Sequence, residues 1–244
     1  MKKHFLNIGL LFTIGLATVA FVSCKTDKAD ESFVIKAENV MNSSDETKTV
    51  VVGWFDENEI GQFMSSLPFA QAPFQNNGFE LTLPGNISTE YLSLISYMLN
   101  EFDEFYVSDV NAQWFGLIYV NTIQALDVNG SRINIISLMD TFEDDDKWQE
   151  WRVGWIYADR DVVVRKEARF LGYETWIDTR DLNLKRGWNT VYMMSEVITN
   201  QQKVTTVLTT TKPVGVNFQW VAEDKGEVWM RIFDMWQNFP YSDE

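Results

Sequence analysis

The sequence has almost no imidazole or thiol: its 244 residues include one histidine, His4, and one cysteine, Cys24. An internal disulfide is excluded, because it requires two cysteines. His4 lies in a segment with the features of an export signal, residues 1–23, so the mature chain is expected to contain no imidazole. Ser–His–Asp and Cys–His catalysis need these groups, and so do zinc sites built on cysteine and histidine. The chemistry that remains open is that of carboxylates.

Basic residues are also scarce. The 20 lysines and arginines face 35 acidic residues, which gives a formal net charge of −15. A surface of this sign repels phosphate backbones, so we expect no nucleic-acid partner. Aromatic residues, in contrast, make up 14% of the chain, which is ample material for a core that needs no disulfide.

The amino terminus has the order of an export signal. Lys2 and Lys3 precede an apolar run, residues 5–22, and Ser23 is a small residue before Cys24. A transmembrane anchor is the alternative, since about eighteen residues could just span a bilayer, but Asn, Thr and Ser residues interrupt or end this run. The Ser-Cys ending resembles the lipobox of bacterial lipoproteins. That resemblance implies cleavage before Cys24 and lipidation of its sulfur, with chains such as palmitate, and two acyl chains suffice for stable anchoring.

Acidic residues follow the expected lipidation site at Asp27, Asp30 and Glu31. This segment is similar to the export tags of surface-exposed Bacteroidetes lipoproteins. The resemblance implies that the protein is lipid-anchored in the cell outer membrane, with the surface and the periplasmic face as the two alternatives.

Composition divides the chain into four parts. We expect a lipoprotein signal peptide at residues 1–23, a flexible polar tether at 24–46, a β domain at 47–222 and an amphipathic tail at 223–244 packed on that domain. The tail places apolar side chains at helical spacing. These are Val228, Trp229, Ile232, Phe233 and Trp236.

Short stretches rich in β-branched and aromatic residues recur along the β domain, as in Thr49–Phe55 and Phe79–Leu83. Asp127-Val128-Asn129-Gly130 has the signature of a hairpin turn, and one short helix is expected after Ser88. No βαβ alternation is present. We therefore predict an all-β fold with one or two short helices, a β-sandwich of transthyretin or immunoglobulin type. A lipocalin-like β-barrel is the alternative.

Four phrases occur together in a recognisable order: Asn77–Pro84, Tyr157–Val162, Leu182–Asn189 and Thr211–Gly215. Their combination resembles a group of uncharacterised Bacteroidetes lipoproteins, in which a lipobox precedes a β-rich domain. The resemblance covers roughly residues 77–220. It implies a β fold and an envelope location, and it implies no catalytic residues.

Tryptophans are the first candidate ligand-binding residues. Trp148, Trp151 and Trp155 cluster in one predicted strand, where Trp151 and Trp155 share a face. Aromatic rings exposed on a sheet can stack against sugars, although most strand tryptophans fill the core. Trp148 is expected to be the most exposed of the three, because it lies beside an acidic turn. Trp188 instead has a structural interpretation: Gly187 supplies a positive φ and Trp188 covers the core edge.

Carboxylates are the second set of candidates. Glu143, Asp144, Asp145 and Asp146 could hold calcium through oxygen ligands, but their spacing does not match an EF-hand, and a solvated turn is favoured. Asp159, Asp161, Glu174 and Asp178 could converge as a hydrolytic pair. The favoured interpretation of Asp159-Arg160-Asp161 is a turn in which Arg160 screens both acids.

These observations favour a non-enzymatic, outer-membrane-anchored binding module whose partner is a glycan or an envelope protein. We expect no cofactor. A carboxylate-based hydrolase acting on glycans is the alternative, and a carrier of small apolar ligands is a third possibility if the fold is a barrel.

Overall fold

A computed structural model describes residues 31–52, 69–95, 105–117, 123–171 and 175–224. Most of these residues, 64%, belong to β-strands, and the strands form packed sheets, which confirms the predicted β-sandwich. The described part of the chain contains no helix that is long and apolar enough to cross a membrane.

Fifteen strands and two short 3-10 turns occur in the described residues. They are β1 (Phe33–Ala37), β2 (Thr49–Val52), β3 (Ala70–Pro73), β4 (Phe79–Leu83), η2 (Thr89–Tyr91), β5 (Ser93–Leu94), β6 (Phe105–Val107), β7 (Gln113–Leu117), β8 (Ile123–Leu126), β9 (Arg132–Glu143), β10 (Lys147–Ala158), β11 (Val162–Leu171), β12 (Thr175–Leu184), β13 (Gly187–Ile198), η4 (Thr199–Gln201), β14 (Lys203–Thr209) and β15 (Gln219–Asp224).

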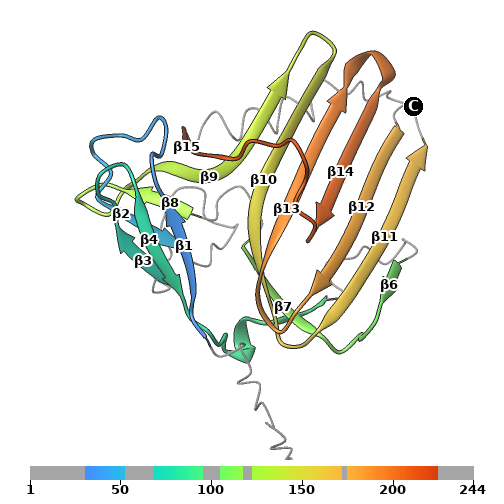
Figure 1. Ribbon diagram of the computed structural model, residues 1–244, viewed down its shortest axis with the longest axis horizontal. Coiled ribbons are helices and arrows are strands. Elements are labelled where there is room, and N and C mark those ends of the chain that lie inside the picture. Colours follow the sequence, from blue (N-terminus) through green and yellow to red (C-terminus); the bar gives the residue numbers. More distant parts are fainter. Residues whose placement is uncertain (1–30, 53–68, 96–104, 118–122, 172–174, 225–244) are drawn as a thin grey trace, which may run out of the picture.

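One large sheet follows the order β3-β2-β8-β9-β10-β13-β14-β12-β11-β6, and β1 pairs with β4 in a separate small sheet. The long strands β9 to β14 stand side by side in Figure 1. Pairing is antiparallel apart from β12 and β14, which run parallel. Among the described strands the sheet ends on β3 and β6 without closing, so the expected alternative of a barrel is wrong.

Strand β10 changes neighbours halfway along its length. Residues 148–152 pair with β9, whereas residues 155–158 pair with β7, and β13 lies along the other edge throughout. Alternation along β10 defines two faces of the large sheet. We call the side of Trp151, Trp155 and Tyr157 the front face, and the side of Glu150, Arg152 and Ile156 the back face.

The first core lies between the small β1–β4 sheet and the front face. Ile35, Leu81 and Leu83 from the small sheet are almost fully buried, and Trp155 and Tyr157 belong to the same cluster. The alternating burial of β1 and β4 is that of strands with one face on a core. Residues 31–46, expected to belong to a tether, therefore include a core strand, because β1 finds its partner more than forty residues later in β4.

The second core lies on the back face, at the end of β10 that pairs with β7. Ile156 and Ala158 join Leu182 and Leu184 of β12, together with Ile95 and Ala112, which follow or precede the short strands β5 and β7. The last four residues of β10 are thus buried on both faces, and the two cores share one strand.

Two local turn predictions are confirmed. Asp127 Oδ1 accepts hydrogen bonds from the backbone N–H groups of Asn129 and Ser131, both at 2.8 Å, and Gly130 has φ +80°. Gly187 has φ +94°, as expected for the residue that starts β13 after a tight turn. Both predictions depended only on neighbouring residues, which is where turn chemistry is decided.

The helix expected after Ser88 is wrong in its described part. Only Thr89–Tyr91 forms a 3-10 turn, and Ser93–Leu94 then pairs with β7 as a strand. Pairing with β7 overrides the helical spacing of Tyr91, Leu92 and Ile95, because it allows Ile95 to be buried in the second core. The helix expected in the carboxyl-terminal tail lies outside the described residues.

Candidate functional site

The three candidate tryptophans do not share one surface. Trp155 is 6% exposed and stacks on Trp220, with ring centroids 6.4 Å apart and an interplanar angle of 15°. Trp151 is partly exposed on the same front face, as its parity predicted, whereas Trp148 is partly exposed on the back face opposite Val197. Trp155 is therefore a core residue, and Trp151 and Trp148 face opposite sides of the sheet.

The acidic segment forms the turn between β9 and β10. Asp144 Oδ1 accepts hydrogen bonds from the backbone N–H groups of Asp146 (3.1 Å) and Lys147 (2.8 Å), and Glu143 to Asp146 are exposed. No group of three metal-ligating side chains occurs in the part of the chain that is described. The carboxylate of Asp144 thus shapes the hairpin, in agreement with the favoured interpretation of a solvated turn.

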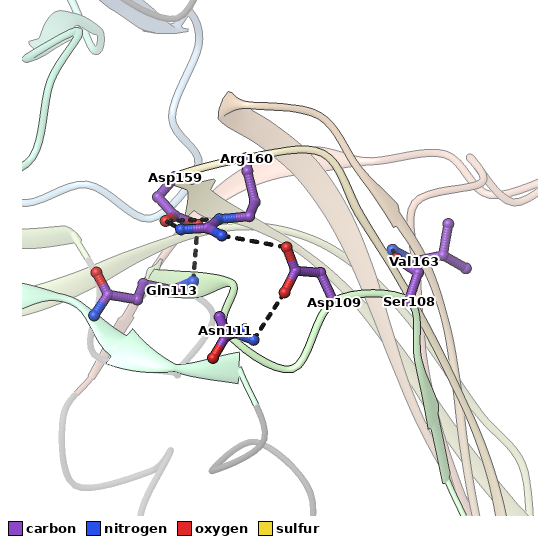
Figure 2. Close-up of polar contacts among 7 residues, drawn as sticks. All are labelled: Ser108, Asp109, Asn111, Gln113, Asp159, Arg160 and Val163. Atoms are coloured by element: carbon purple, nitrogen blue, oxygen red, sulfur yellow. Dashed lines mark hydrogen bonds and ion pairs between the residues drawn. The ribbon is translucent and has the colours of Figure 1, made fainter.

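Asp159 and Asp161 pair with different basic residues. Figure 2 shows the guanidinium of Arg160 between two carboxylates, at 2.8 Å from Asp159 Oδ2 and 3.2 Å from Asp109 Oδ2. Asp161 instead accepts from Lys185 Nζ and from the backbone N–H of Arg186, both at 2.9 Å. The expectation that Arg160 screens both acids of its turn is therefore wrong: its second partner comes from the loop before β7.

This corner connects separate parts of the sheet. Asp159 Oδ1 accepts from the backbone N–H of Gln113 at 2.8 Å, and Ser108 Oγ accepts from that of Val163 at 2.9 Å (Figure 2). The backbone N–H of Asn111 and the nearby Arg160 hold the pKa of Asp109 below its usual value. The Lys185 ammonium likewise lowers the pKa of Asp161. Both oxygens of Asp109 and of Asp161 accept from a donor of the same molecule, so these contacts have a structural role.

Asp178 lies on the back face, away from that corner. Its Oδ2 accepts from Lys166 Nζ at 2.7 Å and lies 3.4 Å from the Arg180 guanidinium, while Thr206 donates to Oδ1 at 3.1 Å. Burial alone would raise the pKa of Asp178, but the hydrogen bond from Lys166 and the two positive charges outweigh it, and the net shift is downward. Glu174, the fourth acid considered, lies outside the described residues. The three described candidates, Asp159, Asp161 and Asp178, therefore do not converge on one site.

The lowered pKa of Asp178 gives a pH prediction. A carboxyl whose folded pKa lies below its usual value of 3.8 contributes stability above that value and loses it as pH falls through the folded pKa. We expect Asp178→Asn to cost about 1–2 kcal/mol at pH 7, because a hydrogen bond to a charged group is lost. The cost should shrink at acidic pH, as the pH falls through the lowered folded pKa and wild-type Asp178 becomes protonated.

Urea unfolding from pH 7 to pH 2 measures this difference between the two proteins. Asp181→Asn is the matched control, since Asp181 pairs with Arg165 through side chains that are half exposed, and we expect a small effect. A cost for Asp178→Asn that stays constant over the whole pH range would contradict the prediction.

A buried charge network lies farther along the back face. Arg152 pairs with Glu150 through Nε and with Glu223 of β15 through Nη1–Oε2 (2.7 Å) and Nη2–Oε1 (3.1 Å), and it donates to Ser137 Oγ at 2.7 Å. Arg152 and Glu223 are 7% and 3% exposed. Sequence reasoning missed this network. A charged residue between Trp151 and Val153 in an apolar strand was the available signal.

The front face carries a different kind of surface, which we call the front-face patch. Its centre is formed by Trp151, Tyr192 and Phe218, all partly exposed, with the rings of Tyr192 and Phe218 at 5.6 Å. Trp151 pairs with Asp140 of β9 on one side and with Met194 of β13 on the other. Tyr192 lies two residues before Met194, so it is a diagonal neighbour of Trp151 on the same face. The connection from β14 to β15, which carries Phe218, crosses in front of β13 and β10 in Figure 1.

Polar groups surround this patch. Gln149 Nε2 donates to Glu196 Oε2 at 3.0 Å, and Lys147 Nζ lies 2.7 Å from the same oxygen. Asp140 Oδ2 accepts from the backbone N–H of Asn217 at 2.9 Å, which ties the crossing connection to β9. Aromatic rings with amide and carboxylate groups at the rim form a surface that can stack a ring and hydrogen-bond its substituents.

No protein-family model, curated protein or solved structure matches this chain.

Proposed function

We propose that this protein is a non-enzymatic binding module, anchored in the bacterial outer membrane through lipidated Cys24, and that it binds glycans on the front-face patch. The observation that carries the proposal is the set of three partly exposed aromatic rings, Trp151, Tyr192 and Phe218, on one sheet face. The lipobox-like sequence supports the proposed anchor, which would hold this face at the cell envelope. Mass spectrometry of the mature amino terminus tests the anchor, which an unmodified chain that retains residues 1–23 would refute.

The electrostatics of the candidate acids support binding over hydrolysis. A general acid must be protonated at the working pH, so its pKa has to be raised. The pKa values of Asp161 and Asp178 are instead lowered by the lysines that pair with them. Both acids are held ionised by ion pairs, with Lys185 and Lys166 respectively, and these ion pairs have a structural role.

The apolar-carrier alternative depended on a closed barrel, and the described sheet is open. An envelope-protein partner remains the second candidate, because aromatic residues are also enriched at the centres of protein interfaces. The two candidates use the same patch, and they differ in whether a free saccharide competes for it.

Tryptophan fluorescence and a glycan array, applied to the purified protein, test the glycan proposal. We expect a saccharide to perturb the fluorescence and Trp151→Ala to weaken its binding at least about tenfold, which corresponds to about 1.4 kcal/mol. The physical reason is that the largest stacking surface of the patch is removed.

Tyr106→Ala is the matched control. Tyr106 is 58% exposed on β6 at the far edge of the sheet, so its removal also deletes an exposed ring but should leave binding unchanged. Loss of binding in both variants, or in neither, would refute the assignment to the patch. If no saccharide binds at all, the protein-partner candidate replaces it.

A further inference from the structure

The back face carries a band of charged and polar side chains across β11, β12, β14, β13 and β10. Cross-strand pairing aligns Asp178, Thr206, Ser195 and Glu150 in one row. A second row contains Lys166 and Arg180, which are cross-strand partners, and Arg152, which follows Leu208 and Met193 along the same row. We call these two rows the back-face band.

The charged members of the band are buried. Glu150, Arg152 and Lys166 are only 6–8% exposed, and the apolar Val204 and Leu208 beside them are each 6% exposed. Side chains on the free face of a sheet reach such values only beneath a covering layer. The described residues that pack on this face, Ile95 and Ala112, belong to the second core at the other end of the strands. The band therefore needs a cover that the described strands do not supply.

The carboxyl-terminal segment, residues 225–244, begins at the edge of the band. It follows Asp224, the last residue of β15, and the preceding Glu223 is bound to Arg152 of β10. The distance from β10 to β11 is four strand spacings, about 19 Å at about 4.8 Å each. A helix over residues 227–239, as the spacing predicts, would be about 20 Å long, so the segment has the length to cross the band.

The side chains of residues 225–244 also match those of the back-face band in chemistry. Its predicted apolar stripe, from Val228 to Trp236, suits Val204, Leu208 and Met193. Asp234, in the half of the predicted helix that lies farther from β10, suits the end of the band where Lys166 and Arg180 contact the carboxylate of Asp178.

We propose that residues 225–244 dock across the back-face band of the same molecule. The occupant is this segment, and the band is its intramolecular binding surface. With this segment docked, the back face is withheld from external partners, whereas the front-face patch stays open to them.

Site-specific photo-cross-linking on the full-length protein tests this docking. A photoreactive p-benzoylphenylalanine replaces Val197, a partly exposed back-face residue of β13 that lies opposite Trp148 and Val204. The matched control carries it at the next residue, Ile198, which is also partly exposed but points to the front face. Circular dichroism and thermal unfolding confirm that both variants are folded.

We expect irradiation at position 197 to give an intramolecular cross-link to a peptide within residues 225–244, and irradiation at position 198 to give at least tenfold less of it. A cross-link to another segment, such as 53–68 or 96–104, would overturn the proposal, and so would a cross-linked dimer. Equal yields at the two positions, or no cross-link from position 197, would also overturn it. None of these results depends on whether a glycan binds, so failure here is distinct from failure of the proposed function.

Discussion

Arg152→Met is expected to lower the free energy of unfolding by about 3–5 kcal/mol, because it leaves the carboxylates of Glu150 and Glu223 buried without their counter-charge. The wild-type guanidinium is deeply buried, and its two carboxylate partners raise its pKa above the usual arginine value even though desolvation acts in the opposite direction. Denaturant unfolding of the two proteins at pH 7 measures the loss.

Two further variants separate the charge effect from loss of packing. Arg160→Met removes an exposed arginine that also contacts two carboxylates, so it should change stability little. Glu150→Gln and Glu223→Gln, added to Arg152→Met, remove the unpaired charges and should restore a large part of the loss. If Arg152→Met costs less than about 1 kcal/mol, or if the combined variant is the least stable of all, the proposed role of the network is wrong.

Trp188→Ala is expected to cost about 3 kcal/mol or more, through the cavity that it leaves in the first core. The indole contacts four rings, with centroid distances of 6.3 Å to Phe33, 6.2 Å to Phe69, 6.2 Å to Phe115 and 5.7 Å to Tyr157. Its Nε1 also donates to the backbone oxygen of Pro84 at 2.8 Å, so one side chain joins β1, β4, β7, β10 and β13.

Trp188→Phe divides this effect into two parts. It keeps most of the ring packing and loses the bond to Pro84, so it should cost about 1–2 kcal/mol. Thermal unfolding of the wild type, Trp188→Phe and Trp188→Ala, with Tyr106→Ala as the exposed aromatic control, measures their order of stability. A cost for Trp188→Ala no larger than that of the Tyr106 control would show that the indole is not part of the core.

The features that could be predicted from the sequence are those decided by near neighbours. The turn at Asp127 and the positive φ of Gly187 depend on a few adjacent residues, and the shared face of Trp151 and Trp155 follows from the two-residue period of a strand. The same period also placed Trp148 on the opposite face. It could not show that Trp155 would be covered, because that cover comes from Trp220 of β15, sixty-five residues later.

Features that depend on distant partners escaped prediction. The Arg152 network joins β10 to β15 across 71 positions, and Arg160 finds Asp109 51 positions before it. Residues 33–35 were recognised as a possible short strand but assigned to the tether because the surrounding region is polar, and only the pairing of β1 with β4 gives this strand a core to face. At Ser93–Leu94 the local sequence predicted the wrong element. The apolar residues around it have helical spacing, but pairing with β7 makes this segment a strand.

The early start of β1 limits how far the folded body can lie from a membrane. From an acylated Cys24 to Phe33 there are nine residue steps, which span at most about 30 Å even when fully stretched. A linker running to residue 46 would have reached about 75 Å. With the proposed acylation of Cys24, a connection of this length would hold the domain within about 30 Å of the lipid surface, so its partners would have to lie in that layer.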